Sequence, residues 1–314
     1  MPAAALPEAK NVAATKPMWW RFRMLMELKP TSTQFIRTMM RTSCIRSALP
    51  SRSPTLTVTA GTNVLRVSTS SSTAGRPWSI DGRAMKEQFG NITLYNADCM
   101  DILRELPDKQ FDLAIVDPPY FDGPNKLGYY GTSKSSKGVK RPFYKAKYWT
   151  VPGNDYFEEL MRVSKHQIIW GCNYYQFPFG SGRIVWDKVN GRSSFSDCEI
   201  AYCSMIDTVR MFSFMWNGMC QGKSASEGRI QQGNKALNEV RIHPTQKPVV
   251  LYKWLLANYA KPGDRILDTH GGSMSSAIAA HDMGFEMTII EKDPEYYTTA
   301  RRRLQWHQAQ LKLF

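Results

Sequence analysis

The sequence is short of the residue types that build metal sites and disulfide frameworks. Its 314 residues include 6 cysteines and 5 histidines, with no Cys-x-x-Cys pair and no His cluster at zinc spacing. We therefore expect a reduced, cytoplasmic setting and no structural metal. No apolar run reaches the roughly 20 residues that a membrane-spanning helix needs, so no membrane partner is expected.

Acidic residues are also scarce, because 27 Asp and Glu stand against 41 Lys and Arg, a formal net charge of +14. Residues 1–84 carry 12 basic and 3 acidic residues, whereas residues 85–314 carry 29 and 24. A basic protein suits a polyanionic partner, but most of this excess lies outside the part that is patterned like a folded domain. Net charge alone is therefore weak support for nucleic-acid binding.

Residues 1–84 lack the periodicity of a domain and are rich in Ala, Ser, Thr, Arg and Pro. Three interpretations stay open: a disordered tail, an organellar transit peptide, or upstream sequence joined to a coding region that begins at Met85. We favour the third, because patterned sequence follows Met85 directly. The predicted organisation is thus a disordered or non-native extension, 1–84, and one folded domain, 85–314.

The segment Asp117-Pro118-Pro119-Tyr120 follows a short apolar run, 111–116, that is typical of a buried parallel strand. Two prolines cannot continue a central strand, so the strand is expected to end there. It would deliver these residues to the carboxyl edge of a sheet, where ligands bind in open α/β folds. An ordinary turn after a strand is the alternative interpretation.

These residue types suit methylation of an exocyclic amine on a nucleobase, which is a weak nucleophile because its lone pair is delocalised into the ring. The Asp117 carboxylate can accept one N–H and the Pro118 carbonyl the other, which localises that lone pair. Tyr120 offers a ring on which a base taken out of a duplex can stack. The predicted catalytic residues are Asp117, Pro118, Pro119 and Tyr120.

Residues 121–150 form a long polar loop in which basic side chains alternate with aromatic ones. Loops of this length in a compact domain are usually functional or disordered. The alternation is typical of a surface that follows a nucleic-acid strand, and we predict DNA contacts at Lys137, Lys140 and Arg141. A solvated lid is the alternative. A second polar and irregular segment, 207–242, is the predicted target-recognition segment.

Hydrophobic periodicity predicts the remaining elements. Helices are expected at 100–106, 156–164, 249–260, 273–283 and 294–310, and strands at 91–95, 111–116, 167–170, 183–186, 198–205, 265–268 and 286–291. Residues 184–186 are expected to pair with 198–205 as a hairpin across Asn190-Gly191. The β-α-β-α ending is typical of a nucleotide-binding half-fold, so the predicted class is α/β.

The stretch from Asp268 to Ser276 combines a strand end, a turn of small residues and a helix start. Its glycines let a ligand approach the backbone, and the helix N-terminus presents free N–H groups. Glu291 ends the next strand, where an acidic residue can hold two ribose hydroxyls. These features predict a site for an adenosine moiety, and the alternative is a tight turn beside an ordinary acidic strand end.

Together with His-Pro-Thr-Gln-Lys-Pro at 243–248, these segments resemble the amino-DNA methyltransferases, which transfer a methyl group from S-adenosyl-L-methionine (AdoMet) to adenine N6 or cytosine N4. The motif order resembles the circularly permuted beta class, and residues 168–173 and 186–188 look like its phage-type members. The resemblance covers about 91–311. It implies a Rossmann-like AdoMet methyltransferase fold, with a mostly parallel mixed sheet and helices on both faces.

The same resemblance implies AdoMet as cofactor and a set of cofactor-binding residues. They are Asp98, Cys99, His243, Thr245, Gln246, Lys247, Asp268, His270, Gly271, Gly272, Ser273, Ser275 and Glu291. The glycine turn departs from the family pattern, since Thr269 and His270 replace Pro and Phe, and Met274 replaces a second Gly. Met274 is therefore expected to put a side chain where the cofactor of such proteins lies against bare backbone.

The predicted function is a site-specific DNA methyltransferase for adenine N6, with double-stranded DNA as partner, in a bacterium or a phage-infected host. A homodimer and a restriction partner are left open. Cytosine N4 is a rival target, although Asp rather than Ser at position 117 favours adenine by family habit. Other rivals are methylation of a glutamine amide, which uses Asn-Pro-Pro-Tyr, and a catalytically weakened DNA-binding remnant, motivated by Met274 and the atypical N-terminus. A nucleophilic Cys99 or Cys172 is disfavoured, because neither follows a proline.

Overall fold

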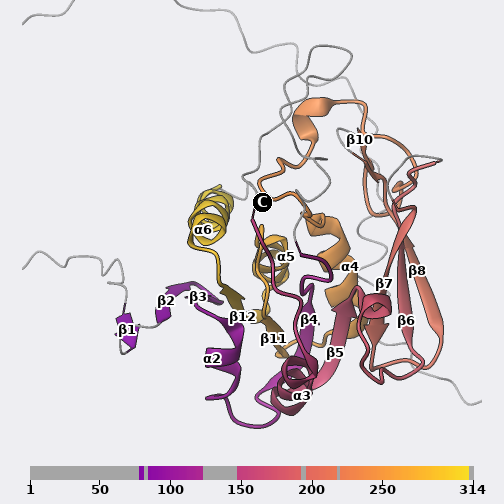
Figure 1. Ribbon diagram of the computed structural model, residues 1–314. Helices are drawn as coiled ribbons and strands as arrows, with labels where there is room; N and C mark the ends of the chain where they lie inside the picture. Colours follow the sequence, from indigo (N-terminus) through magenta and orange to yellow (C-terminus); the bar gives the residue numbers. More distant parts are fainter. Residues whose placement is uncertain (1–77, 81–83, 123–146, 192–195, 218–219, 311–314) are drawn as a thin grey trace, which may run out of the picture. The chain divides into compact units, whose positions relative to one another are not determined.

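The computed structural model describes residues 78–80, 84–122, 147–191, 196–217 and 220–310. Its main element is a mixed ten-stranded sheet with the order β1-β2-β3-β12-β11-β4-β5-β7-β6-β8 (Figure 1). The central strands run parallel to one another. They are β3 (Ile92–Asn96), β12 (Glu286–Glu291), β11 (Arg265–Asp268), β4 (Phe111–Val116) and β5 (Ser164–Trp170).

Mostly antiparallel strands extend this parallel centre on both sides. β2 (Ala84–Phe89) pairs antiparallel with β3, and β1 (Trp78–Ile80) pairs antiparallel with β2. On the other side, β7 (Cys198–Cys203) is antiparallel to β5, β6 (Arg183–Asp187) is antiparallel to β7, and β8 (Val209–Ser213) is parallel to β6. The predicted mixed sheet and the predicted pairing of β6 with β7 are confirmed.

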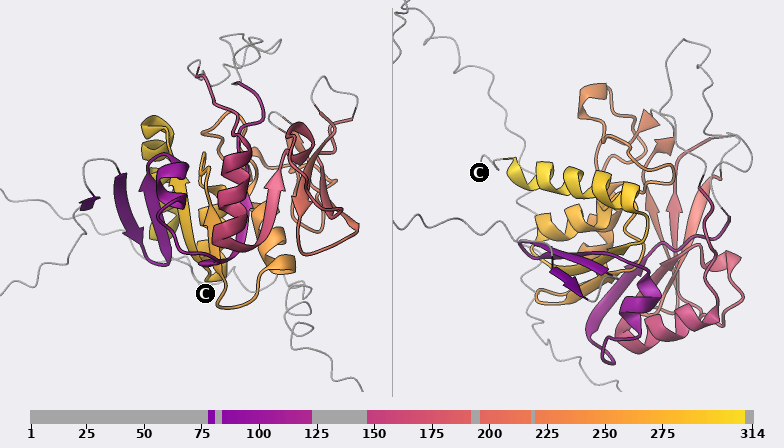
Figure 2. Two further views of the ribbon diagram at one scale, coloured as in Figure 1. Left: turned by 60° about the horizontal axis from the view of Figure 1, so that its bottom comes forward. Right: turned by 60° about the vertical axis from the view of Figure 1, so that its left-hand side comes forward.

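Helices cover both faces of the sheet (Figure 2). One face carries α4 (Val249–Tyr259), α5 (Ser275–Met283) and α6 (Pro294–Ala309). The other face carries α2 (Cys99–Leu103) and α3 (Asn154–Val163). No helix among the described residues is both long and apolar enough to cross a membrane.

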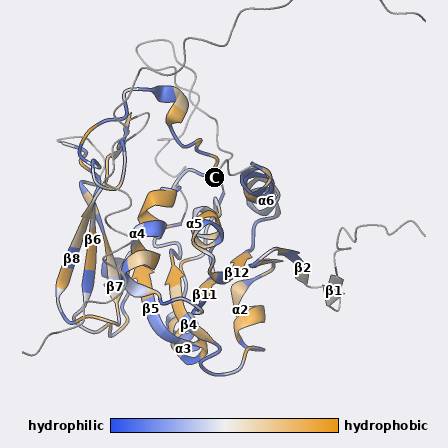
Figure 3. Cartoon of the chain, turned by 180° about the vertical axis from the view of Figure 1, so that it is seen from behind, coloured by the Kyte–Doolittle hydropathy of each residue, from blue (hydrophilic) through white to orange (hydrophobic). Residues whose placement is uncertain are grey.

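The central strands are hydrophobic along their whole length because both of their faces are covered. In β4, Leu113 and Ile115 pack into the cluster under α4 and α5, whereas Ala114 and Val116 pack into the cluster under α2 and α3. Figure 3 shows the hydrophobic colour concentrated on β4, β5 and part of α4. Each fully buried Leu, Ile or Val contributes about 1.5–3 kcal/mol to this packing.

The helices that follow β11 and β4 leave the sheet toward opposite faces. The chain after β11 enters α5 on one face, while the chain after β4 leads to α3 on the other. Neighbouring parallel strands whose connections diverge in this way leave a crevice at their carboxyl ends. The fold therefore places a binding crevice between the ends of β11 and β4, where Asp268 and Asp117 lie.

The segment 207–242 is more ordered than its polar composition predicts. Besides β8, it contains β9 (Trp216–Asn217) paired with β10 (Cys220–Gln221), and the short helix η2 (Lys235–Leu237). The prediction of an irregular segment is therefore wrong at these elements. Alternation is hard to see in β8, because this edge strand exposes its first three residues. The strand β1, in turn, lies ahead of the predicted boundary at Met85.

Candidate active site

The crevice holds a cavity of about 600 Å³, a volume typical of small-molecule sites. All predicted catalytic residues line it, and so do all predicted cofactor residues except Asp268. The structure thus brings together three segments that are far apart in the sequence: 117–120, 243–247 and 269–275. Lys137, Lys140 and Arg141 lie outside the described residues.

The two carboxylate oxygens of Asp117 have different surroundings. Oδ2 lies 2.5 Å from Nζ of Lys247 in an ion pair. Oδ1 is buried, and among the described residues it has no hydrogen-bond partner. A buried acceptor without a donor costs about 1–3 kcal/mol, so Oδ1 is prepared to accept a hydrogen bond from a molecule in the cavity. Burial raises the pKa of the Asp117 carboxyl, and the ammonium of Lys247 opposes that shift.

Lys247 is the centre of a chain of buried charges. Its Nζ also lies 2.9 Å from Oε2 of Glu199 on β7, and Oε1 of Glu199 lies 2.5 Å from Nζ of Lys188. Burial alone would raise the pKa of Glu199, but the two ammonium groups lower it to about 2. The Lys188 and Glu199 side chains are 15% and 18% exposed, so this ion pair is largely shielded from solvent.

The second predicted acceptor already has one donor in the protein. The Tyr175 hydroxyl donates a hydrogen bond of 2.7 Å to the Pro118 carbonyl. A carbonyl oxygen has two lone pairs, so Pro118 can still accept one N–H from a bound molecule. Tyr175 follows the short helix η1 (Cys172–Tyr174), which comes directly after β5. No pattern in the sequence indicates this contact.

The ring of Tyr120 packs against the chain that follows β5. It stacks on Tyr174, with 4.6 Å between ring centroids and 6° between the planes. On Gly171, whose φ is +71°, a Cβ atom would lie 2.4 Å from the Tyr120 ring, so glycine is required here. Tyr174 is 57% exposed and occupies the stacking position that we predicted for a base.

A second aromatic group lies over the His-Pro-Thr segment. Trp149 stacks on His243, with 5.7 Å between ring centroids. Tyr296 meets the same His243 ring edge-on, with 4.3 Å between centroids. Trp149 belongs to the last part of the predicted basic loop, 121–150, which the structure describes from residue 147. Burial lowers the pKa of His243 to about 3, so its imidazole is neutral at physiological pH. Lys147 closes this side through an ion pair with Asp293 at 2.5 Å.

The glycine turn is held by the two acidic strand ends. Oδ1 of Asp268 accepts the His270 N–H at 3.0 Å, and Oδ2 accepts the Ser276 hydroxyl at 2.6 Å. Asp268 therefore shapes the turn from below and does not line the cavity. Oε2 of Glu291 accepts the Gly272 N–H at 2.7 Å, and this side chain does line the cavity. Burial raises the pKa of Glu291 to about 7.

Thr269 and His270, which replace the Pro and Phe of the family pattern, belong to a hydrogen-bonded chain at the cavity wall. The Tyr156 hydroxyl lies 2.6 Å from Oγ1 of Thr269, which lies 2.9 Å from Nδ1 of His270. Burial lowers the pKa of His270 to about 4, so its ring is neutral. Nearby, Asp98 caps α2 by accepting the Met100 N–H at 2.9 Å.

The two cysteines considered as nucleophiles are poorly suited to that role. Burial raises the pKa of Cys99 to about 12 and also raises the pKa of Cys172, which disfavours the nucleophilic thiolate form of both. Within the described part of the chain, no group of three or more His, Cys, Asp and Glu side chains is placed to hold a metal ion.

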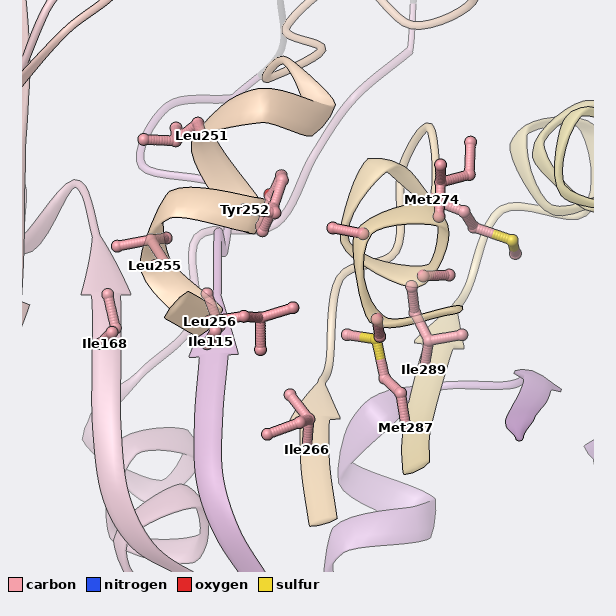
Figure 4. Packing of buried hydrophobic residues seen from close by; sticks show 14 of the residues in the cluster. Ile115, Ile168, Leu251, Tyr252, Leu255, Leu256, Ile266, Met274, Met287 and Ile289 are labelled. Atoms are coloured by element: carbon pink, nitrogen blue, oxygen red, sulfur yellow. The ribbon is translucent and has the colours of Figure 1, made fainter. Parts of the chain in front are cut away.

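Met274 does not meet the cavity, which corrects the expectation from the sequence. It caps α5 with a φ of +55°, in the left-handed region where glycine is normally found. Its side chain is fully buried, and Figure 4 shows it in the cluster that includes Met287 and Ile289. The positive φ explains why the family pattern has glycine at this position. The Met274 side chain does not enter the cavity. The main motivation for a DNA-binding remnant is removed.

The buried carboxyl of Asp268 predicts a pH-dependent stability. Burial raises its pKa to about 6 from an ordinary value of 3.8, so the folded state holds the proton more tightly than the unfolded state. The free energy of unfolding should therefore fall by roughly 3 kcal/mol as pH rises from about 4 through 6. Asp268→Asn should lack this fall, since an amide can serve the same partners. Urea unfolding of both proteins across this range would measure the difference, and a constant difference would contradict the prediction.

Comparison with known proteins finds similar chains among DNA methyltransferases. A family model described as DNA methylase matches residues 185–302. The type II methyltransferase M.HinfI of Haemophilus influenzae is 25% identical over 271 residues, 70% of each chain. The DNA adenine methyltransferase YhdJ of Escherichia coli K12 is 25% identical over 265 residues, 69% of this chain and 84% of YhdJ. The structure of M1.HpyAVI with SAM, 19% identical, covers 68% of this chain and 99% of its own at a TM-score of 0.41. These matches support an AdoMet-dependent amino-DNA methyltransferase.

Proposed function

We propose that this enzyme methylates the exocyclic N6 of adenine in double-stranded DNA, and that Asp117, Pro118 and Tyr120 act on the target base. The observation that carries the proposal is Oδ1 of Asp117, a buried acceptor with no donor among the described residues. An amine N–H in the cavity would satisfy it, and the Pro118 carbonyl would accept the other N–H. These two acceptors raise the nucleophilicity of the nitrogen as the new N–C bond forms.

The remaining wall of the cavity suits the cofactor. AdoMet supplies a methyl group on a positively charged sulfonium. Glu291 lines the cavity beside the glycine turn, so its carboxylate is placed to accept ribose hydroxyls. Gly271 and Gly272 let the ligand approach the backbone. We assign the cofactor to the residues that the resemblance implies, except Lys247, whose ammonium pairs with Asp117 and Glu199. Asp268 acts through the turn that it holds.

Two observations favour adenine over cytosine. Position 117 carries Asp rather than Ser, and YhdJ, which is similar over most of its length, is named as an adenine methyltransferase. Both amines fit the same pair of acceptors, so cytosine N4 is the second candidate. Mass spectrometry of nucleosides from DNA of cells that express the gene tests the proposal. We expect N6-methyladenine. Detection of N4-methylcytosine alone would identify cytosine as the target. Absence of both methylated nucleosides would contradict both candidate functions.

We further propose that the loop 121–150 and the segment 207–242 contact DNA. The support is their basic and aromatic content, together with the place of Trp149 at the cavity. Neutralising Lys137, Lys140 and Arg141 together should weaken DNA binding and reduce the slope of log K against log salt by nearly one unit for each lost phosphate contact. Fluorescence anisotropy at several salt concentrations measures this slope. An unchanged slope would remove these three residues from the interface.

Residues 85–314 are the proposed methyltransferase domain, and a homodimer stays open. A chain that begins at Met85 is expected to keep AdoMet binding, because every described residue that lines the cavity comes after Met85. The truncation removes β1 and the first residue of β2, so a modest loss of thermal stability is expected at this sheet edge. Calorimetric titration with AdoMet tests it. If the truncated chain lost binding while the full chain kept it, the extension would belong to the domain.

A further inference from the structure

Lys247 belongs to the His-Pro-Thr-Gln-Lys-Pro segment that the resemblance assigns to the cofactor, but its ammonium contacts two protein carboxylates. Nζ lies 2.5 Å from Asp117 and 2.9 Å from Glu199, and the Lys247 side chain is 3% exposed. The indole ring of Trp170 lies 5.4 Å from Nζ. Burying such an ion triad is costly, and an apolar cluster of similar volume is often as stable. The arrangement therefore calls for a role beyond stability.

The contact constrains how Asp117 can be used. Lys247 holds Oδ2, so a rotation of the carboxylate that brought Oδ2 into the cavity would break the ion pair. Oδ1 remains as the oxygen that can receive a donor. Burial favours the neutral acid, which would lose the charge that activates an amine, whereas the neighbouring ammonium favours the carboxylate. Lys247 thus acts on both the orientation and the charge of Asp117.

Glu199 and Lys188 complete a group of four charges that sum to zero. Glu199 shares the ammonium of Lys247 and is itself neutralised by Lys188 at 2.5 Å. The other titratable groups that interact with this group are Tyr175, Tyr252, His243 and Asp268. Burial lowers the pKa of His243 to about 3, so its ring is neutral. Burial raises the pKa of both tyrosines, so they contribute no charge. The two ammonium groups and Glu199 therefore dominate the field at Asp117.

We propose that Lys247 and Glu199 are positioning residues, which hold the Asp117 carboxylate ionised with Oδ2 fixed and Oδ1 presented to the target amine. This inference rests on the proposed role of Asp117 in methyl transfer. It assigns to Lys247 a contact with the catalytic carboxylate in place of the cofactor contact that the sequence implied. Glu199, on β7, acts through Lys247 and does not itself reach the cavity, since it is not among the residues that line it.

The pH dependence of single-turnover methylation separates this role from a merely structural one. Lys247→Met removes the ammonium, so the pH at which the rate falls on the acid side should rise by at least one unit. Glu199→Gln removes a negative charge, so Asp117 becomes the only carboxylate paired with Lys247. The fall of the rate on the acid side should then move to lower pH. Lys247→Arg keeps the charge and should restore the limb toward its original position. Calorimetry should show AdoMet affinity within about threefold of the unaltered protein for all three.

A matched control removes a similar ion pair elsewhere. Lys253 pairs with Asp282 at 2.7 Å, away from the cavity, so Lys253→Met should leave the pH profile unmoved. If Lys247→Met does not fold, Glu199→Gln carries the test, because the amide has nearly the same shape as the carboxylate. Equal rate losses at every pH, with no shift of the acid limb, would overturn the inference.

Two further results would have distinct meanings. Loss of AdoMet binding in Lys247→Met, with normal binding in Glu199→Gln, would make Lys247 a cofactor ligand and would also overturn the inference. Absence of methylated DNA with the unaltered protein would instead contradict the proposed function. The two failures are therefore distinguishable.

Discussion

Replacing Asp117 with alanine is expected to lower the rate of methyl transfer by at least about 10²–10³-fold, the usual effect of removing one preorganised hydrogen-bond partner of a transition state. AdoMet binding should remain nearly intact, because the glycine turn and Glu291 are untouched. Single-turnover methylation of a DNA duplex and calorimetric titration with AdoMet measure the two effects separately. Methylation by Asp117→Ala at the parent rate would make the segment merely a turn.

The asparagine variant is a sharper test, because the structure decides which way its amide faces. Lys247 donates to the atom at the Oδ2 position, so the amide oxygen of Asp117→Asn should lie there. Its NH₂ group would then occupy the Oδ1 position and would present a donor to the N–H of the target amine. Asp117→Asn should therefore be about as slow as Asp117→Ala. An intermediate rate would mean that the amide oxygen reaches the target.

The position of Asp117 could be predicted from sequence because its causes are local. An uninterrupted apolar run predicts a strand that is covered on both faces, and the two prolines end it. The positions of the glycine turn and Glu291 could be predicted in the same way. Each comes at the end of a parallel strand, and parallel strands end at the same edge of a sheet. The fold class, the position of the crevice and most residues of the cavity wall could therefore be predicted from the sequence.

The partners of Asp117 could not be predicted, because they depend on strand pairing across the sheet. Glu199 reaches Lys247 only because β7 lies beside β5 in an antiparallel register, where Ala201 is opposite Trp170. A carboxylate inside an otherwise apolar strand was the available signal, since an unpaired charge is rarely buried. The prediction for Met274 was wrong for a different reason. Its backbone is in the left-handed region, which directs the side chain to the core, and a comparison of motifs does not reveal this.

Replacing Tyr120 with alanine is expected to impair capture of the flipped base. Stacking of one base on an aromatic ring contributes about 1–3 kcal/mol, so base capture should fall by roughly 5- to 150-fold. Tyr120→Trp should retain more activity than Tyr120→Ala, because a stacking surface survives. The fluorescence of 2-aminopurine at the target position reports base flipping directly, and calorimetry serves to verify that AdoMet binding is retained.

Tyr174 provides the matched control for this experiment. Its ring covers Tyr120 at 4.6 Å between centroids, but it is 57% exposed, so it can leave when a base enters. Gly171 also packs close to the Tyr120 ring, because a Cβ atom at this position would lie 2.4 Å from it. Tyr174→Ala should therefore reduce base capture less than Tyr120→Ala does. A larger loss in Tyr174→Ala would instead identify Tyr174 as the ring on which the base stacks, with Tyr120 as its support.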